Sequence, residues 1–213
     1  MKTDQFIEIL SSDLHPVKRG VVGKTLAWAL IVGGAAAFGL MLVSVGVRPG
    51  LFGGTGPTFL ALKLAFTISL IGAGAAFLSA ASHPGRSSRK RFLLAFLPFV
   101  AVALLALGAV LLSAPMARHG MVFAAEWLTC LVCIPLFAIV PFAALIWALR
   151  MGAPTDLRRT GAIAGLVAGS LGAAAYAFHC SGDSLPFIAI WYGTPILLWT
   201  LIGAMLGPRL LRW

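Results

Sequence analysis

Residues 92–113 read FLLAFLPFVAVALLALGAVLLS, an apolar run without a charged side chain. About 20 apolar residues in a helix cross the roughly 30 Å hydrocarbon core of a bilayer, so this run predicts a transmembrane helix. The whole chain has the same character, because 60% of its 213 residues are hydrophobic and only 10% are charged. A typical soluble domain carries about 25% charged residues. The composition therefore excludes an ordinary water-soluble protein.

Similar apolar stretches follow one another along the chain, separated by segments rich in proline, glycine and charged residues. They predict an all-α fold, a polytopic membrane bundle of six transmembrane helices in one domain, residues 21–213. The predicted spans are about 25–47, 58–81, 92–113, 125–149, 160–179 and 187–206. Residues 1–20 are predicted to form a separate tail with a short amphipathic helix.

The basic residues predict the orientation, because lysine and arginine in short loops are retained on the cytoplasmic side. With the N-terminus inside, all but three of the sixteen lysines and arginines fall on the inner side. The exceptions are Arg48, Lys63 and Arg118. Lys63 lies about one turn into the second span and is expected to extend toward the outer surface. Both termini are therefore predicted to be cytoplasmic.

The distribution of charge also limits the function. No ionisable residue falls near the middle of a predicted span, where ion carriers and proton pumps hold the groups that bind or relay charge. The net charge of +10 comes from short basic runs between apolar stretches, which argues against direct nucleic-acid binding. No enzymatic activity and no cofactor are expected.

Small residues and prolines within the spans predict helix packing. Gly161, Gly165 and Gly169 recur every four residues on one face of the fifth span, a pattern that permits close helix contact. We interpret them as packing residues of the bundle, with a homodimer seam as the alternative. Three prolines are expected to kink their helices: Pro98, Pro135 and Pro141.

The N-terminal tail is the only sizeable polar segment. A short helix capped by Thr3 or Asp4 would place four apolar residues on one stripe at helical spacing: Phe6, Ile7, Leu10 and Leu14. Acidic residues occupy other positions: Asp4, Glu8 and Asp13. Such a helix could lie on the inner leaflet, but an anionic leaflet repels carboxylates. A protein partner with an apolar groove and a basic rim fits the tail better.

Three cysteines lie near the predicted outer face. Cys130 and Cys133 are about a turn inside the fourth span and share a helix face with Glu126, whereas Cys180 ends the fifth span. His119, His179 and Asp183 lie in the adjoining outer loops. We interpret Cys133 as a small apolar residue and Cys130 with Cys180 as a functional pair. That pair would form a reversible disulfide or a thiolate metal site, with His179 as a further candidate ligand.

The chain resembles the NrsF-type anti-sigma factors, formerly the domain of unknown function 1109 family, over nearly its whole length. The resemblance rests on MKTDQFIEILSSDLHPV at 1–17, WLTC at 127–130 with IPL at 134–136, and RMGAP at 150–154. Most specific is GLVAGSLGAAAYAFHCSGDSLPFIAIWY at 165–192. Members are six-span inner-membrane proteins that hold an extracytoplasmic-function sigma factor inactive through a short cytoplasmic N-terminal segment.

The resemblance implies roles for the tail and the cysteines. The apolar stripe of the tail would dock on the sigma factor, and the acidic residues would face its basic, DNA-binding surface. Two family cysteines near the outer face, implicated in signal response, match Cys130 and Cys180, and the closeness of Cys133 leaves the disulfide partner open. The expected function is a membrane anti-sigma factor that responds to oxidative or metal stress in the envelope. The alternative is a membrane thiol redox protein or metal carrier that uses the three cysteines and His179.

Overall fold

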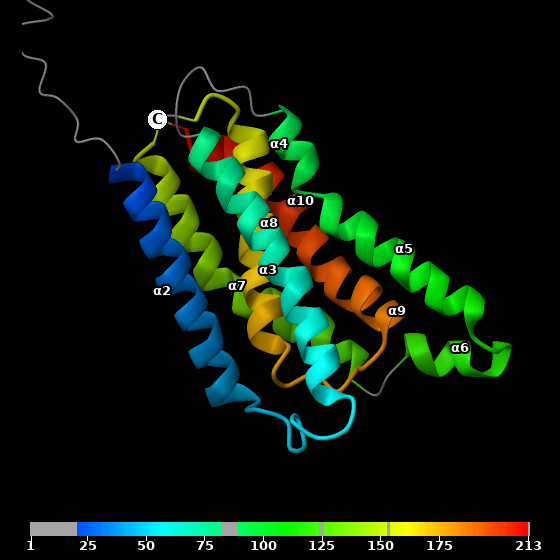
Figure 1. Cartoon of the computed structure of the whole chain (residues 1–213). Coiled ribbons are helices and arrows are strands. Elements are labelled where there is room, and N and C mark those ends of the chain that lie inside the picture. The colour runs from blue at the N-terminus through cyan, green and yellow to red at the C-terminus, as the bar shows by residue number, and fades with distance from the viewer. Residues whose placement is uncertain (1–20, 82–88, 124–125, 153, 213) are drawn as a thin grey trace, which may run out of the picture.

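The computed structural model describes residues 21–81, 89–123, 126–152 and 154–212. Every regular element within these ranges is a helix, which confirms the all-α class (Figure 1). The predicted cytoplasmic tail, residues 1–20, lies outside the described residues. So do the sigma-binding residues predicted within it: Asp4, Phe6, Ile7, Glu8, Leu10, Asp13 and Leu14.

The helices follow the predicted spans closely. In chain order they are α2 (Val21–Ser44), α3 (Gly56–Ala81), α4 (Arg89–Leu94), α5 (Leu97–Leu112), α6 (Pro115–Val122), α7 (Trp127–Arg150), α8 (Leu157–Tyr176), α9 (Leu185–Phe187), the π-helix η1 (Ile188–Tyr192) and α10 (Gly193–Leu210). In the part of the chain that the structure describes, five helical stretches are long and apolar enough to cross a membrane, namely those that contain α2, α3, α5, α7 and α10. The fifth predicted span, α8, is not among these five.

The position of α8 explains its weaker hydrophobicity. It packs against α2, α3, α7 and α10, and nearly all of its residues after Arg159 are buried. A helix enclosed by other helices need not offer an apolar surface to lipid, so alanine and glycine can replace larger apolar residues. Its 20 residues, at about 1.5 Å each, give a length of about 30 Å, which suits a membrane span.

Glycines let α8 and α10 approach until their backbones touch. A Cβ atom built on Gly161 would overlap the carbonyl oxygen of Gly203 and lie 2.6 Å from the Cα of Gly207. A Cβ on Gly165 would overlap the carbonyl oxygen of Trp199, and one on Gly169 would lie 3.0 Å from the Cα of Ile196. The interpretation of these three α8 glycines as packing residues of the bundle is confirmed, and the face that they share is already covered by α10.

The helical stretch that contains Pro98, residues 90–112, is interrupted between Leu94 and Leu97, just before this proline, rather than bent as one continuous helix. Pro98 lies in the first turn of α5, after α4 has ended at Leu94, and a missing backbone N–H breaks no hydrogen bond at that position. Pro135 and Pro141 do lie inside α7. Gly33 of α2 packs directly on Pro141, since a Cβ there would lie 2.8 Å from the Cα of Pro141.

Different segments of the chain lie at the two ends of the bundle. The start of α2 and the end of α10 lie at one end, and the α2–α3 connection and the loop after α8 lie at the other (Figure 1).

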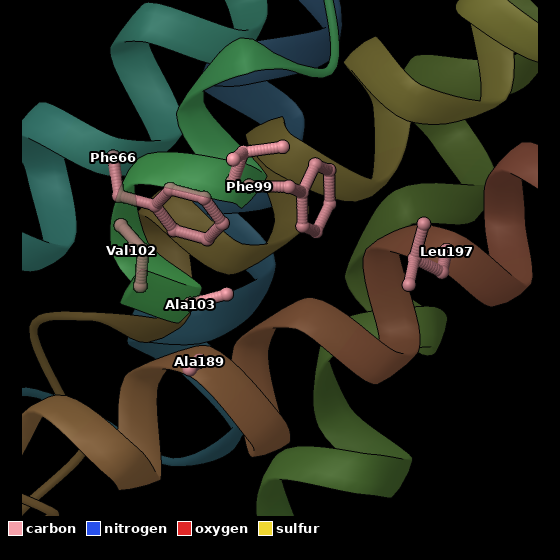
Figure 2. Close-up of a pocket in the computed structure, with 7 residues that line it drawn as sticks. Phe66, Phe99, Val102, Ala103, Ala189 and Leu197 are labelled. Atoms are coloured by element: carbon pink, nitrogen blue, oxygen red, sulfur yellow. The ribbon is translucent and has the colours of Figure 1, made fainter. Parts of the chain in front are cut away.

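An apolar pocket between α3, α5 and η1–α10 is lined by residues that include Phe66, Phe99 and Leu197 (Figure 2). None of its lining side chains is titratable or nucleophilic, so this pocket offers no chemistry.

Candidate functional site

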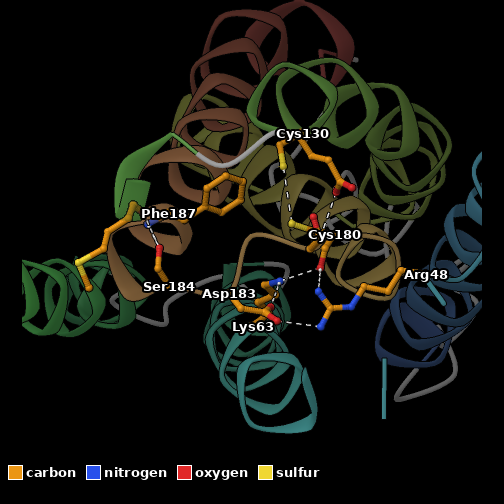
Figure 3. A network of polar contacts seen from close by, with 10 residues as sticks. Arg48, Lys63, Cys130, Cys180, Asp183, Ser184 and Phe187 are labelled. Atoms are coloured by element: carbon orange, nitrogen blue, oxygen red, sulfur yellow. Dashed lines mark hydrogen bonds and ion pairs between the residues drawn. The ribbon is translucent and has the colours of Figure 1, made fainter. Parts of the chain in front are cut away.

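The structure brings Cys130 and Cys180 together at the end of the bundle opposite the start of α2. Their sulfur atoms lie 3.9 Å apart, and both residues are 0% exposed (Figure 3). Cys130 lies in the first turn of α7, and Cys180 lies in the loop that joins α8 to α9. A disulfide has an S–S length of about 2.05 Å, so oxidation would draw the sulfur atoms together by about 1.9 Å.

Cys133 lies outside this contact. It is half-buried on α7, one turn beyond Cys130, and packs against the hydrophobic core. This environment is the one that a small apolar residue would occupy. The geometry therefore favours Cys180 over Cys133 as the neighbour of Cys130.

Two cations and a carboxylate hold the loop that carries Cys180 (Figure 3). Lys63 of α3 donates from Nζ to the carbonyl oxygen of Cys180 at 3.0 Å and to Oδ1 of Asp183 at 3.2 Å. Arg48, in the connection between α2 and α3, donates to the same carbonyl oxygen at 3.2 Å and to Oδ2 of Asp183 at 2.8 Å. We call Arg48, Lys63 and Asp183 the clamp. It fixes the main chain at Cys180 from two sides.

The side chain of Lys63 extends to the loop at the predicted end of the bundle, but it is buried there, with only 1% of it exposed. An ammonium group buried without partners would lose far more hydration energy than it could recover. The carboxylate of Asp183 and the carbonyl of Cys180 supply the missing partners within the bundle. The Lys63 ammonium also lies 5.9 Å from the centre of the Tyr192 ring, a favourable position over an aromatic face.

Further contacts tie the same loop to α2 and α7. The backbone N–H of Arg48 donates to the carbonyl of Phe178 at 3.1 Å, and Nδ1 of His179 lies 3.0 Å from the carbonyl oxygen of Gly46. On the other side, the backbone N–H of Ser181 donates to Glu126, one turn before Cys130. The loop is thus attached to the end of α2 and to the start of α7.

The same contacts bear on the predicted metal site. His179 directs a ring nitrogen to Gly46, and its ring packs against Tyr176. Across residues 21–81, 89–123, 126–152 and 154–212, no three or more His, Cys, Asp or Glu side chains gather closely enough to hold a metal ion. Cys130 and Cys180 are adjacent, but His179 does not complete a ligand set with them.

Two buried tyrosines complete the surroundings of the sulfur atoms. Tyr176 ends α8 and Tyr192 ends η1, both are 0% exposed, and neither hydroxyl has a hydrogen-bond partner. Both tyrosine side chains lie close to the sulfur atoms, Tyr176 near Cys130 and Tyr192 near Cys180. Tyr192 owes its position to a short π-helix, a rare geometry that is often found at functional sites.

The electrostatic surroundings distinguish the two thiols. Cys180 lies beyond the end of α8, and a hydrogen bond from Cys130 lowers the pKa of its thiol below the ordinary value. Burial opposes this shift, whereas the nearby Lys63 ammonium acts in the same direction as the hydrogen bond. A thiolate is the reactive form of cysteine, and the Lys63 ammonium that favours it is bound to the main chain of Cys180 rather than to that of Cys130.

Sequence reasoning missed the clamp and the two tyrosines. It placed Asp183 near the cysteines but assigned no partner to Lys63 or Arg48. One signal was present, since these two cations are among the three basic residues that break the inside bias of charge. A basic residue that violates this bias inside an apolar span is a candidate for a buried partner.

Comparison with known proteins places the chain in a family. Residues 10–213 match the family NrsF, described as negative regulator of sigma F. The chain is 30% identical to the probable anti-sigma-F factor NrsF of Azospira oryzae and 31% identical to the anti-sigma-F factor NrsF of Caulobacter vibrioides. Each alignment covers 100% of both chains. No solved structure matches the chain. The family predicted from the sequence is confirmed: the chain belongs to the NrsF family of anti-sigma factors.

Proposed function

We propose that this protein is a six-span anti-sigma factor of the bacterial inner membrane, with both termini in the cytoplasm. Residues 1–20 bind an extracytoplasmic-function sigma factor, and the pair Cys130–Cys180 senses an oxidative or metal-stress signal on the outer side. The observation that carries the proposal is the buried contact between the two sulfur atoms, 3.9 Å apart, in a chain of the NrsF family.

Two features support the proposed topology. The start of α2 and the end of α10 lie at the same end of the bundle, as an even number of crossings requires (Figure 1). In the predicted arrangement, all of the lysines and arginines except Arg48, Lys63 and Arg118 lie toward that end. Because basic residues are retained on the cytoplasmic side, this end is the cytoplasmic one. In this topology α8 is the fifth span, enclosed by the others.

The proposed release mechanism uses α2 as a rigid connection. This helix begins at Val21, directly after the tail, and the chain that follows it contacts the cysteine loop through Gly46 and Arg48. Formation of a disulfide would draw Cys180 toward Cys130 by about 1.9 Å, while its carbonyl is held by Arg48. The displacement would reach α2 through these contacts and change the position of the tail, because packed helices transmit shifts as rigid elements.

The tail is tested by co-purification of the full-length protein with its cognate sigma factor. Replacing Phe6 and Leu10 together by Asp places charges on the apolar stripe, and we expect this variant to lose the sigma factor. Gln5→Asp with Ser12→Asp is the matched control, since it adds the same charge on the opposite side of a helix and should retain binding. Undiminished binding by the Phe6→Asp, Leu10→Asp variant would remove the tail from the account.

The rival function, a membrane thiol redox protein or metal carrier, predicts a different result for the cysteines. In a variant with Cys130→Ser and Cys180→Ser, sensing predicts that sigma binding persists while induction by stress is lost. A thiol redox protein would instead lose a redox activity, and a metal carrier would lose metal uptake, with no effect on the sigma factor.

A further inference from the structure

Positive charge exceeds negative charge in the clamp. Arg48 and Lys63 share the single carboxylate of Asp183, and the three side chains are 13%, 1% and 19% exposed. Glu126, the nearby acidic residue of α7, accepts from the backbone of Ser181 instead. One positive charge is therefore left over in a poorly hydrated place, where an uncompensated charge is costly.

The two cations of the clamp bind the main chain at Cys180. The carbonyl oxygen of this residue accepts hydrogen bonds from both cations, at 3.0 Å from Lys63 and 3.2 Å from Arg48. With the carbonyl fixed in this way, the side chain of Cys180 is directed to Cys130, and the sulfur atoms meet. A thiolate at Cys180 would offset the surplus charge, because its anion would lie on the residue whose carbonyl oxygen both cations hold, and the Lys63 ammonium favours the anionic form.

We propose that Lys63 and Arg48 are positioning residues for Cys180, which hold its carbonyl so that its sulfur faces Cys130 and supply the positive charge that makes Cys180 the thiolate of the pair. This inference rests on the proposed function, in which the cysteine pair is the sensor. It extends that function by naming the residues that prepare the reactive sulfur atom.

Charged and titratable groups face Cys180 from every element packed against it. Lys63 contributes the positive charge from α3, and Arg48 contributes it from the α2–α3 connection. The other groups are Cys130 and Glu126 of α7, Tyr176 of α8, Tyr192 of η1, and His179 and Asp183 of the same loop. Of these, only the two cations combine positive charge with a direct hydrogen bond to Cys180.

The test measures disulfide formation in the purified full-length protein with hydrogen peroxide, a two-electron oxidant, as the probe. The Cys180 thiolate attacks one peroxide oxygen, the O–O bond breaks and hydroxide leaves, so that Cys180 becomes a sulfenic acid. The sulfur of Cys130 then attacks that of Cys180, the S–S bond forms, and the sulfenic hydroxyl leaves as water with the Cys130 proton. The rate is followed across pH 5–9 in a Cys133→Ser background, which leaves only the two cysteines of the pair.

Removal of either cation should shift this pH profile upward. We expect Lys63→Met and Arg48→Gln each to move the midpoint of the profile up by about one pH unit, which lowers the rate at pH 5, below the midpoint of the parent, by about tenfold. Lys24→Met is the matched control, because Lys24 is an exposed lysine of α2, and its profile should equal that of the parent. Arg48→Gln alters a partly exposed loop residue, so it preserves the test if Lys63→Met does not fold.

Asp183→Asn separates charge from mere loss of structure. This variant keeps both cations, so the midpoint of its pH profile should lie at or below that of the parent. A purely structural role of the clamp would instead move the midpoint in the same way in all three variants. The inference is overturned if Lys63→Met and Arg48→Gln keep the parent profile, or if Asp183→Asn moves the midpoint of the profile upward as they do. Absence of any Cys130–Cys180 disulfide in the parent is a separate outcome, which removes the sensing part of the proposed function and this inference with it.

Discussion

Gly165→Ala should destabilise the bundle although it adds a single methyl group. The new Cβ would overlap the carbonyl oxygen of Trp199 and lie 2.7 Å from its carbonyl carbon and 3.2 Å from the Cα of Thr200. These are backbone atoms that cannot rotate away, so α10 would have to withdraw from α8. Overpacking of this kind costs about 3 kcal/mol, and the better helix propensity of alanine returns about 1 kcal/mol. We expect a net loss of about 2 kcal/mol in the free energy of unfolding.

The assay is unfolding of the purified protein in mixed micelles with increasing dodecyl sulfate, followed by circular dichroism. Gly72→Ala is the matched control, because Gly72 also lies inside a helix but has nothing within 4 Å of the added Cβ. This control should be neutral or slightly stabilised. Equal stability of the two variants would refute the central position of α8 and its backbone contact with α10.

Two further predictions concern the clamp and the topology. Asp183→Ala should destabilise the protein by about 3 kcal/mol, since it leaves Lys63 and Arg48 without a carboxylate. Asp183→Ala with Lys63→Met should be the more stable of the two variants, so a double variant that unfolds no later than Asp183→Ala would contradict this pairing. In a cysteine-free background, an impermeant maleimide should label Phe52→Cys in intact spheroplasts but Thr155→Cys only after lysis, because both positions are exposed at opposite ends of the bundle. The reverse pattern of labelling would show that the orientation is inverted.

The long helices could be predicted from the sequence because each one contains an apolar run bounded by proline, glycine or charged residues, whereas short helices such as α4 and α6 contain no such run. The glycines of α8 also gave a correct prediction, since three small residues on one face have little use except close packing. At Pro98 the sequence predicted a disruption of the helix but not its form, because proline is compatible with both a kinked helix and a helix start. Hydropathy alone cannot distinguish the two.

The site was predictable only in part. Cys130 and Cys180 were selected by their common end of the bundle and by family resemblance, and the structure adds that their sulfur atoms touch. The clamp was not predictable, because the partners of Lys63 come from segments more than a hundred residues away in sequence. The position of Tyr192 was not predictable either, because it depends on the π-helix, which no sequence pattern indicates. Long-range pairing of polar groups depends on how the helices assemble.

In the proposed function, the state of the cysteine pair controls release of the sigma factor. The most direct measurement is the amount of sigma factor that co-purifies with the full-length protein before and after exposure of cells to hydrogen peroxide. We expect the wild-type protein to lose its sigma factor on exposure, whereas the Cys130→Ser, Cys180→Ser variant retains it in both conditions. Equal release from the wild-type protein and the variant would contradict the account.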